Sequence, residues 1–299
     1  MTEEKHTLTP LQGIILNIYK EVKQILDRHG LRYFAIGGTC IGAVRHGGFI
    51  PWDDDLDIAL PDVDFKKFLE IAQRELPSNL KLIKSYDRRH CASLEAKVFD
   101  CGTTFIEEPE RRNPELFKGV FIDIFPLGGT PEDEKQRDKF CKKLVMYKRF
   151  NEKRRCRLSD LSRTRSKVMW FAVLPLKLLP YRFWTNKIHK MTDKYPFDAH
   201  TYTAHLWDSK LRQFLMERED IYGGYTELPF EDTVIRCPKN FDKHLRIIFG
   251  DYMTLPPEEE RRAHHAEKSF VDTEKPYTYY QDHYRKHGTL KKELACSPK

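Results

Sequence analysis

The chain has 299 residues, of which 40% are hydrophobic and 12% aromatic, so it can bury a core and is not a disordered polypeptide. Its polar N-terminus and the lack of a long uncharged apolar run predict neither a secretory signal nor a transmembrane helix. Seven scattered cysteines without a Cys-x-x-Cys pair favour unpaired thiols in a reducing cytoplasm over a disulfide framework or a cysteine zinc site.

The net charge of +7 is unevenly distributed along the chain. Residues 135–194 contain 19 Lys or Arg against 4 Asp or Glu, whereas the rest of the chain contains 33 against 41. We expect this basic arm to meet an anionic partner, and nucleic acid, a phosphate-rich polymer and a membrane surface all qualify.

Helical and strand patterns alternate over the first 128 residues. Thr9 and Pro10 are typical of a helix start, and apolar residues at helical spacing continue to Gly30. The next expected elements are a strand at 33–36, a short helix at 39–45, a strand at 56–60, a helix at 62–76, and strands at 80–85, 92–99 and 120–125. This order predicts an α/β fold, with a mixed sheet flanked by helices.

After Pro131 the pattern becomes helical. Residues 135–157 are strongly basic, and residues 168–188 are aromatic and apolar with basic flanks. In the last third of the chain we expect a strand at 234–235 and a helix at 239–249.

Residues 37–60 are the most informative stretch, because four acids crowd beside a strand-like segment. They are Asp53, Asp54, Asp55 and Asp57. Alternate side chains of a strand share a face, so Asp55 and Asp57 should project together while their apolar neighbours point to the core. Two acids entering an apolar strand indicate a bound cation, and magnesium is the usual one. Asp53 and Asp54 are equally consistent with a solvated turn.

Asp123 repeats this arrangement as a lone acid in the apolar strand 120–125, where it is costly unless paired or metal-bound. Gly37 and Gly38 follow a strand and precede a short helix, so backbone amides there can approach a phosphate. Together these parts predict a metal-dependent transfer site acting on a phosphate, with Mg²⁺ or Mn²⁺ as the cofactor.

The segment 37–58 resembles the signature of the LicD family of phosphotransferases, residues 121–127 resemble its second conserved block, and residues 241–257 resemble its C-terminal block. The resemblance covers roughly residues 10–270. It implies a nucleotidyltransferase-like fold and the transfer of phosphocholine from CDP-choline to a sugar hydroxyl on a cell-surface glycan precursor, such as lipopolysaccharide or teichoic acid. The fukutin-like relatives move ribitol phosphate from CDP-ribitol. Their zinc-binding insert has no matching cysteine cluster here, so a structural zinc is not implied.

Carried over position by position, the resemblance implies that Gly37 and Gly38 form the glycine motif, that Asp55 and Asp57 hold the metal, and that Asp123 is the third carboxylate. In the expected mechanism the acceptor hydroxyl attacks the distal phosphorus and CMP leaves. Asp123 either completes the metal shell or takes the hydroxyl proton.

The candidate substrate-binding residues are Gly37, Gly38, Thr39, Arg45, His46 and Lys97. Arg45 and His46 follow the glycine motif within one short helix and could reach the diphosphate, although a surface role for His46 is almost as well supported. Lys97 is a weaker phosphate candidate. Trp52 is expected in the core rather than as a stacking platform, and the histidines 244, 264 and 265 are expected to be structural or exposed.

We predict a nucleotidyltransferase-like catalytic core at residues 1–130, a basic helical region at 131–230 and a C-terminal part of the same LicD-like domain at 231–299. Residues 163–190 are too short and proline-broken to span a membrane. They could lie peripherally on the inner face of the cell membrane, which would suit a lipid-linked acceptor, or form a core helix under a solvated basic face.

Two other functions compete with phosphocholine transfer. A true nucleotidyltransferase would use the same metal cradle to attack a nucleoside triphosphate and release pyrophosphate. A nucleic-acid-binding protein would use the basic arm, but the arm contains no recognisable reading motif and the acids lie apart from it, so no nucleic-acid partner is expected.

Overall fold

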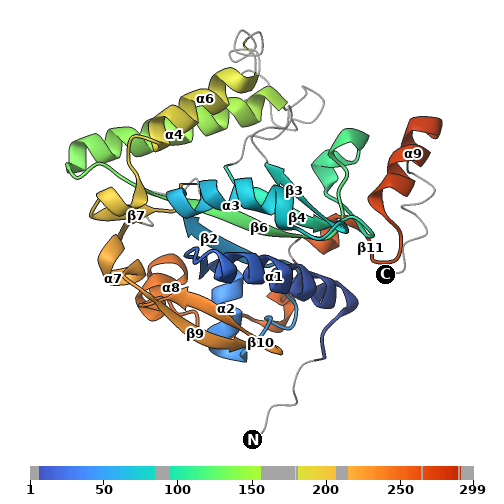
Figure 1. Ribbon diagram of the computed structural model, residues 1–299, viewed down its shortest axis with the longest axis horizontal. Helices are drawn as coiled ribbons and strands as arrows, with labels where there is room; N and C mark the ends of the chain where they lie inside the picture. The colour runs from blue at the N-terminus through green and yellow to red at the C-terminus, as the bar shows by residue number, and fades with distance from the viewer. Residues whose placement is uncertain are drawn as a thin grey trace, which may run out of the picture.

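The computed structural model describes residues 7–84, 94–155, 179, 181–206, 215–263, 265–288 and 290. Its described part is a mixed α/β fold around a curled sheet with strand order β1-β2-β6-β4-β3, extended by β7 on β6 and β8 on β7 (Figure 1). Strands β2 and β6 are parallel, whereas the other neighbours are antiparallel. The predicted class, a mixed sheet flanked by helices, is confirmed.

The strands are β1 (Phe34–Ala35), β2 (Asp57–Pro61), β3 (Leu80–Lys84), β4 (Ala96–Asp100), β5 (Thr104–Ile106), β6 (Phe121–Gly129), β7 (Tyr202–Ala204), β8 (Met216–Glu217), β9 (Tyr225–Phe230), β10 (Thr233–Pro238) and β11 (Phe270–Asp272). Strands β9 and β10 form a hairpin, and β5 pairs with β11. The α-helices are α1 (Pro10–Arg28), α2 (Gly37–His46), α3 (Asp62–Glu75), α4 (Glu134–Arg155), α6 (Tyr181–Thr192), α7 (Arg218–Tyr222), α8 (Phe241–Phe249) and α9 (Tyr277–His287). Short 3₁₀ turns cover Glu108–Glu110, Pro114–Leu116, Phe197–Ala199, Glu258–Glu260 and Ala266–Lys268.

Helices α1 and α3 pack together on one face of the sheet. The predicted start of α1 is confirmed by a reciprocal cap, in which Thr9 Oγ1 accepts from the Gln12 amide and the Gln12 side chain accepts from the Thr9 amide, each at 3.1 Å. The even-numbered side chains Ile58, Val98 and Ile122 lie in this core. Because side chains alternate along a strand, the odd-numbered side chains face away from α1 and α3.

Helix α2 packs on β2, on the β9–β10 hairpin and on α8. It begins at Gly37, so the two glycines belong to its first turn rather than to a turn before it. The main core joins α1 residues to Phe230, Ile235 and Leu245 from the C-terminal third. The proposed domain limits at 130 and 230 stay a prediction.

Helices α4 and α6 pack against each other as an outer layer above the sheet (Figure 1). Phe140, Leu144 and Ile188 from these helices meet Leu94 and Leu206 in a separate cluster. The expected helical character of 135–155 is confirmed, but residues 156–178, with most of the aromatic stretch, lie outside the described residues. Within the described part, no helix is long and apolar enough to cross a membrane.

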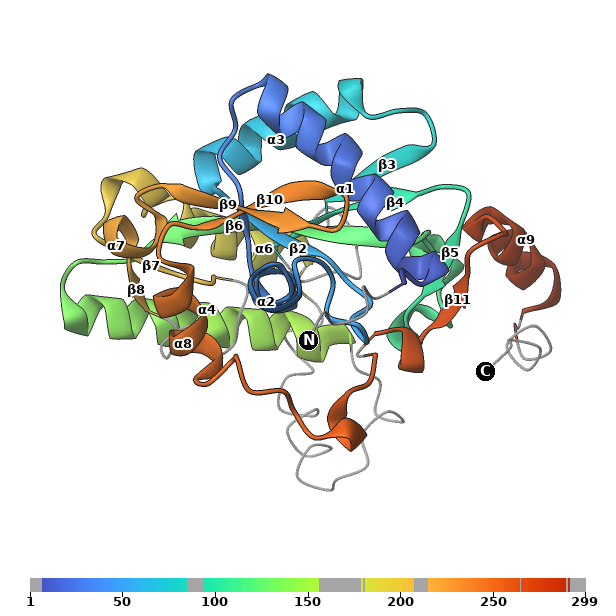
Figure 2. The same ribbon diagram turned by 90° about the horizontal axis from the view of Figure 1, so that it is seen from below.

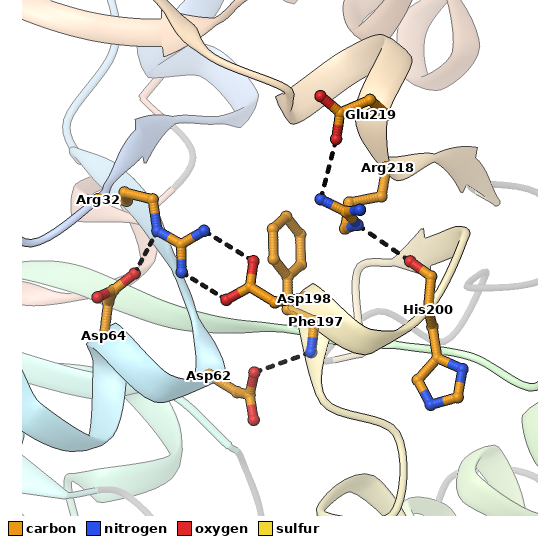
Figure 3. A network of polar contacts seen from close by, with 8 residues as sticks. All are labelled: Arg32, Asp62, Asp64, Phe197, Asp198, His200, Arg218 and Glu219. Carbon is orange, nitrogen blue, oxygen red and sulfur yellow. Dashed lines mark hydrogen bonds and ion pairs between the residues drawn. The ribbon is translucent and has the colours of Figure 1, made fainter.

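A polar network joins the segment 197–198 to α3 and to Arg32, which lies just before β1 (Figure 3). Arg32 donates from Nε to Asp64 at 2.7 Å and from both Nη atoms to Asp198, also at 2.7 Å. Asp62 accepts from the backbone amide of Phe197 at 2.9 Å. We call Arg32, Asp64 and Asp198 the Arg32 clamp. Each of its two carboxylates has a cation partner, so the clamp is a closed structural unit.

Candidate active site

A row of charged side chains crosses three neighbouring strands on the face opposite α1 and α3. Asp57 of β2 pairs in register with Asp123 of β6, and Asp123 pairs in register with Lys97 of β4. Residues directly opposite each other on neighbouring strands project from the same side of the sheet, so these three side chains share a face. The parallel pairing of β2 with β6 therefore brings together two acids that are 66 positions apart in the sequence.

Lys97 neutralises Asp123 at this row. Its Nζ lies 2.6 Å from Oδ1 and 2.8 Å from Oδ2 of Asp123, and 3.9 Å from the centre of the Phe121 ring. Burial opposes the charge of Lys97, but the Asp123 carboxylate raises the pKa of the ammonium above its ordinary value. The sequence suggested Lys97 as a phosphate ligand, and in this structure its partner is a carboxylate.

Asp57 lies against the first turn of α2. A Cβ placed on Gly37 would be 3.5 Å from Asp57 Oδ2, and one placed on Gly38 would be 2.6 Å from Asp53 Oδ2. Gly37 also has a φ of +58°, which L side chains rarely adopt. Thr39 Oγ1 accepts from the Asp57 amide at 2.8 Å. The glycine pair thus gives two carboxylates room to approach the N-terminal turn of a helix.

Like charges crowd at this point. Burial, followed by the charges of Asp55 and Asp123, raises the pKa of Asp57 well above its ordinary value. Burial together with Asp55 and Asp54 raises the pKa of Asp53 to about 8. Burial and like charges act in the same direction here, so at neutral pH these carboxyl groups resist ionisation until a cation is supplied.

A C-terminal segment contacts the acid loop, by which we mean residues 53–57 with their four aspartates. His265 Nε2 lies 3.1 Å from Asp55 Oδ2, and this hydrogen bond raises the pKa of His265 to about 9 despite partial burial. Asp54 is 5% exposed and accepts from the backbone amides of His265 and Ala266. Asp54 is therefore not a solvated turn residue, which the sequence had left open. His265 is exposed, as expected, but its ring also bonds to Asp55. Asp55 precedes β2 rather than lying inside it.

Three further charged side chains that the sequence did not single out lie near the row. Glu107 bonds to the buried Lys118 at 2.6 Å, and although burial opposes it, the charges of Lys118 and Lys97 lower the pKa of Glu107 to about 2. Glu95 is buried beside Lys97, and burial raises its pKa. No local spacing distinguishes these residues, because they flank the strands: Glu95 precedes β4, Glu107 follows β5 and Lys118 lies between β5 and β6.

The donor chemistry of the acid cluster suits a hard divalent cation, since Mg²⁺ and Mn²⁺ prefer carboxylate oxygens. A cation near Asp57 would also offset the mutual repulsion that raises its pKa. Among the residues that the structure describes, no group of three or more His, Cys, Asp or Glu side chains is already arranged to hold a metal ion. Lys97 and His265 instead pair with Asp123 and Asp55, so these two cations occupy carboxylates that the sequence assigned to a metal.

Arg45 and His46 lie in the last turn of α2, at the end remote from the glycines. Arg45 donates from Nη1 to the carbonyl of Tyr252 at 2.7 Å, and from Nε to His46 Nε2 at 3.0 Å. The Trp52 ring meets the His46 ring edge-on and packs partly against the main core. The C-terminal segment thus also reaches this end of α2.

Comparison with known proteins gives one matching family model and several similar proteins. Residues 30–155 match the family model described as LicD/FKTN/FKRP, nucleotidyltransferase domain. The chain is 28% identical over 279 residues to the lipopolysaccharide cholinephosphotransferase LicD of Haemophilus influenzae, covering 90% of this chain and 99% of that protein. A 36-residue stretch is 47% identical to the ribitol 5-phosphate transferase FKRP of human and of mouse, covering 12% of this chain and 7% of each relative. Residues 30–155 are therefore a LicD-family domain, and the chain is similar to a LicD protein along nearly its whole length.

Proposed function

We propose that this LicD-family phosphotransferase moves a substituted phosphate, in the first place phosphocholine, from a CDP-linked donor to a hydroxyl of a cell-surface glycan precursor. Two relatives support the reaction class, since one is named a cholinephosphotransferase and another a ribitol 5-phosphate transferase. The observation that carries the proposal is the crowding of the half-buried Asp57 with the buried Asp123 and the neighbouring acids, which raises the pKa values of both. Such a cluster is costly to keep unless a ligand uses it.

The acceptor hydroxyl would attack the distal phosphorus of the donor. A bond forms between the acceptor oxygen and that phosphorus, the bond to the bridging oxygen breaks, and CMP leaves with that oxygen. Asp123 Oδ is positioned by Lys97 at 2.6 Å and would either take the hydroxyl proton or hold the cofactor. His265, with a pKa of about 9, carries a proton at neutral pH and would keep Asp55 oriented until the donor binds.

Asp55 and Asp57 would hold Mg²⁺ or Mn²⁺, with Asp123 as a third ligand. Bound there, the ion would neutralise the diphosphate and stabilise the charge that develops on the leaving group. The first turn of α2 lies beside these acids, since Gly37 and Gly38 approach the Asp57 and Asp53 carboxylates and Thr39 accepts from the Asp57 amide. The amides at Gly37 and Gly38 and the hydroxyl of Thr39 would contact the donor phosphates.

The acceptor class follows from the Haemophilus relative, whose name includes lipopolysaccharide. A teichoic-acid precursor is the equivalent acceptor in other envelopes. We propose a cytoplasmic enzyme that works peripherally on the inner membrane face, where a lipid-linked precursor would be available. The predicted membrane contact at 163–190 falls largely outside the described residues, which include 179 and 181–190 of that range.

The decisive experiment incubates the protein with CDP-choline, CDP-ribitol or a nucleoside triphosphate, with and without Mg²⁺, and with a lipopolysaccharide precursor as acceptor. Release of CMP together with a phosphocholine-modified glycan would support the proposal. Release of pyrophosphate from a triphosphate would instead establish the nucleotidyltransferase alternative. That alternative is tested because the matched family model is described as a nucleotidyltransferase domain. Steeply salt-dependent binding to DNA or RNA, with neither product, would favour the basic-arm alternative.

A further inference from the structure

Two arginines from distant parts of the chain lie on either side of an aromatic pair beside the acid loop. Arg45 ends α2, and Arg261 belongs to the segment between α8 and β11. Arg45 Nε lies 3.0 Å from His46 Nε2, the His46 and Trp52 ring centres are 6.5 Å apart, and the guanidinium carbon of Arg261 lies 5.5 Å from the centre of the Trp52 ring. We call these four residues the Arg45–Arg261 cluster.

Neither arginine has a carboxylate partner among the described residues. The Arg45 guanidinium donates to the carbonyl of Tyr252 at 2.7 Å, and the Arg261 guanidinium donates to the carbonyl of Pro256 at 2.9 Å. Three glutamates directly precede Arg261 at 258–260, but their side chains are exposed, and the contact with Arg261 is a backbone one, from the Arg261 amide to the Glu258 carbonyl at 3.1 Å. The Arg32 clamp differs, because its arginine is saturated by two carboxylates.

Both guanidinium groups are partly buried and still retain unused donors. Each has five N–H groups, and the contacts above use only some of them. Burial and the nearby charge of Arg261 lower the pKa of Arg45 below its ordinary value. Two cations held near each other without a counter-ion favour an anion, and the fork geometry of arginine matches phosphate oxygens.

The cluster adjoins the acid loop at both of its contributing segments. Trp52 directly precedes Asp53, and Arg261 lies four residues before His265, which bonds to Asp55. In Figure 2, α2 is seen end-on, and the segment that follows α8 passes on this side of the molecule. A ligand phosphate at the cluster would therefore belong to a molecule that also reaches the carboxylates.

We propose that Arg45 and Arg261 form a phosphate-binding subsite, with Trp52 as the ring that positions Arg261. This inference rests on the proposed function. The two arginines would supply positive charge for the donor diphosphate, which the nearby aspartates alone would repel. The phosphate belongs either to the nucleotide of the donor or to a phosphorylated glycan acceptor. The same chemistry serves both, and the test separates them.

The test measures binding of CMP, cytidine and a sugar phosphate to the full-length protein by calorimetry, with no turnover required. Arg261→Ala should weaken CMP binding by about 10-fold or more and leave cytidine binding unchanged, because only the phosphate contact is lost. Arg261→Lys should recover part of the affinity, since it keeps the charge but loses the fork. Trp52→Leu should give a smaller loss than Arg261→Ala.

Arg262→Ala is the matched control, because Arg262 is the exposed neighbour of Arg261 in the same segment. It should bind CMP like the wild type, and thermal melts of all variants should report an intact fold. A loss confined to the sugar phosphate would assign the subsite to the acceptor. CMP and sugar-phosphate affinities that are both unchanged in Arg261→Ala would overturn the subsite. A wild type that binds no cytidine compound would instead count against the CDP-linked donor.

Discussion

The Arg32 clamp and the acid site are both built from aspartates and cations, but their charges are balanced differently. In the clamp one arginine serves two carboxylates, and its hydrogen bonds lower the pKa of Asp198. At the site, burial and neighbouring acids raise the pKa values of Asp53 and Asp57. A balanced cluster stabilises the fold, whereas an unbalanced one stores repulsion that a ligand can relieve.

Removing one acid from each region tests most directly whether the two clusters differ in function. Asp57→Asn should reduce phosphate transfer at least about 100-fold, because a group that acts on the reacting phosphate is lost. In metal-free protein the same change should leave the free energy of unfolding unchanged or raise it, since one repelling charge disappears. Transfer assays and urea melts check both expectations. Asp198→Asn is the control: transfer should stay normal, and the free energy of unfolding should fall only slightly, because solvent screens the exposed pair with Arg32.

A second test uses pH on the metal-free protein. Folded Asp53 has a pKa of about 8 against 3.8 when unfolded, so between these values the folded state holds a proton that the unfolded state has released. Stability should therefore fall as the pH rises through this window, by about 1.4 kcal/mol per pH unit for each proton held. His265 acts in the same direction, because its raised pKa contributes stability below 6.5 that is lost as the pH rises through about 9.

Urea midpoints at pH 5 and pH 8 in EDTA would measure this slope. Asp53→Asn should flatten it, because the amide does not titrate. An equal slope in wild type and variant would mean that Asp53 is ionised throughout, and the site would then be better balanced than its geometry indicates.

Magnesium should selectively stabilise the acid site. At a concentration of 100 times its dissociation constant, an ion that binds only the folded state adds about 2.7 kcal/mol to the free energy of unfolding. Thermal melts should thus shift upward with Mg²⁺ or Mn²⁺ in the wild type and in Asp198→Asn, but not in Asp57→Asn. An equal shift in all three proteins would mean that the ion binds elsewhere, and the proposal that Asp57 helps to hold it would be wrong.

Local patterns predicted the elements that build the site, but not the contacts that complete it. The cap at Thr9, the strand with Asp57 and the strand with Asp123 all follow from spacing within a few residues. His265 and Arg261 lie about 210 positions from their partners Asp55 and Trp52, and no periodicity encodes that pairing. Lys97 stood out in an alternating strand, but its contact with Asp123 depends on the register of β4 against β6, which the whole sheet sets.

The smallest expected effect concerns the Arg32 clamp and its contribution to stability. Arg32→Ala leaves Asp64, whose side chain is 9% exposed, without its cation, and should lower the free energy of unfolding by about 1–3 kcal/mol. The exposed pair with Asp198 adds little to this loss, because solvent screens it. Arg32→Lys should recover only part of the stability, since one ammonium cannot bond to both carboxylates in the same way. Transfer activity should remain normal in both variants when assayed well below their melting temperatures. A large loss of transfer in a folded Arg32→Lys protein would show that the clamp also positions the site, and the separation between balanced and unbalanced clusters would fail.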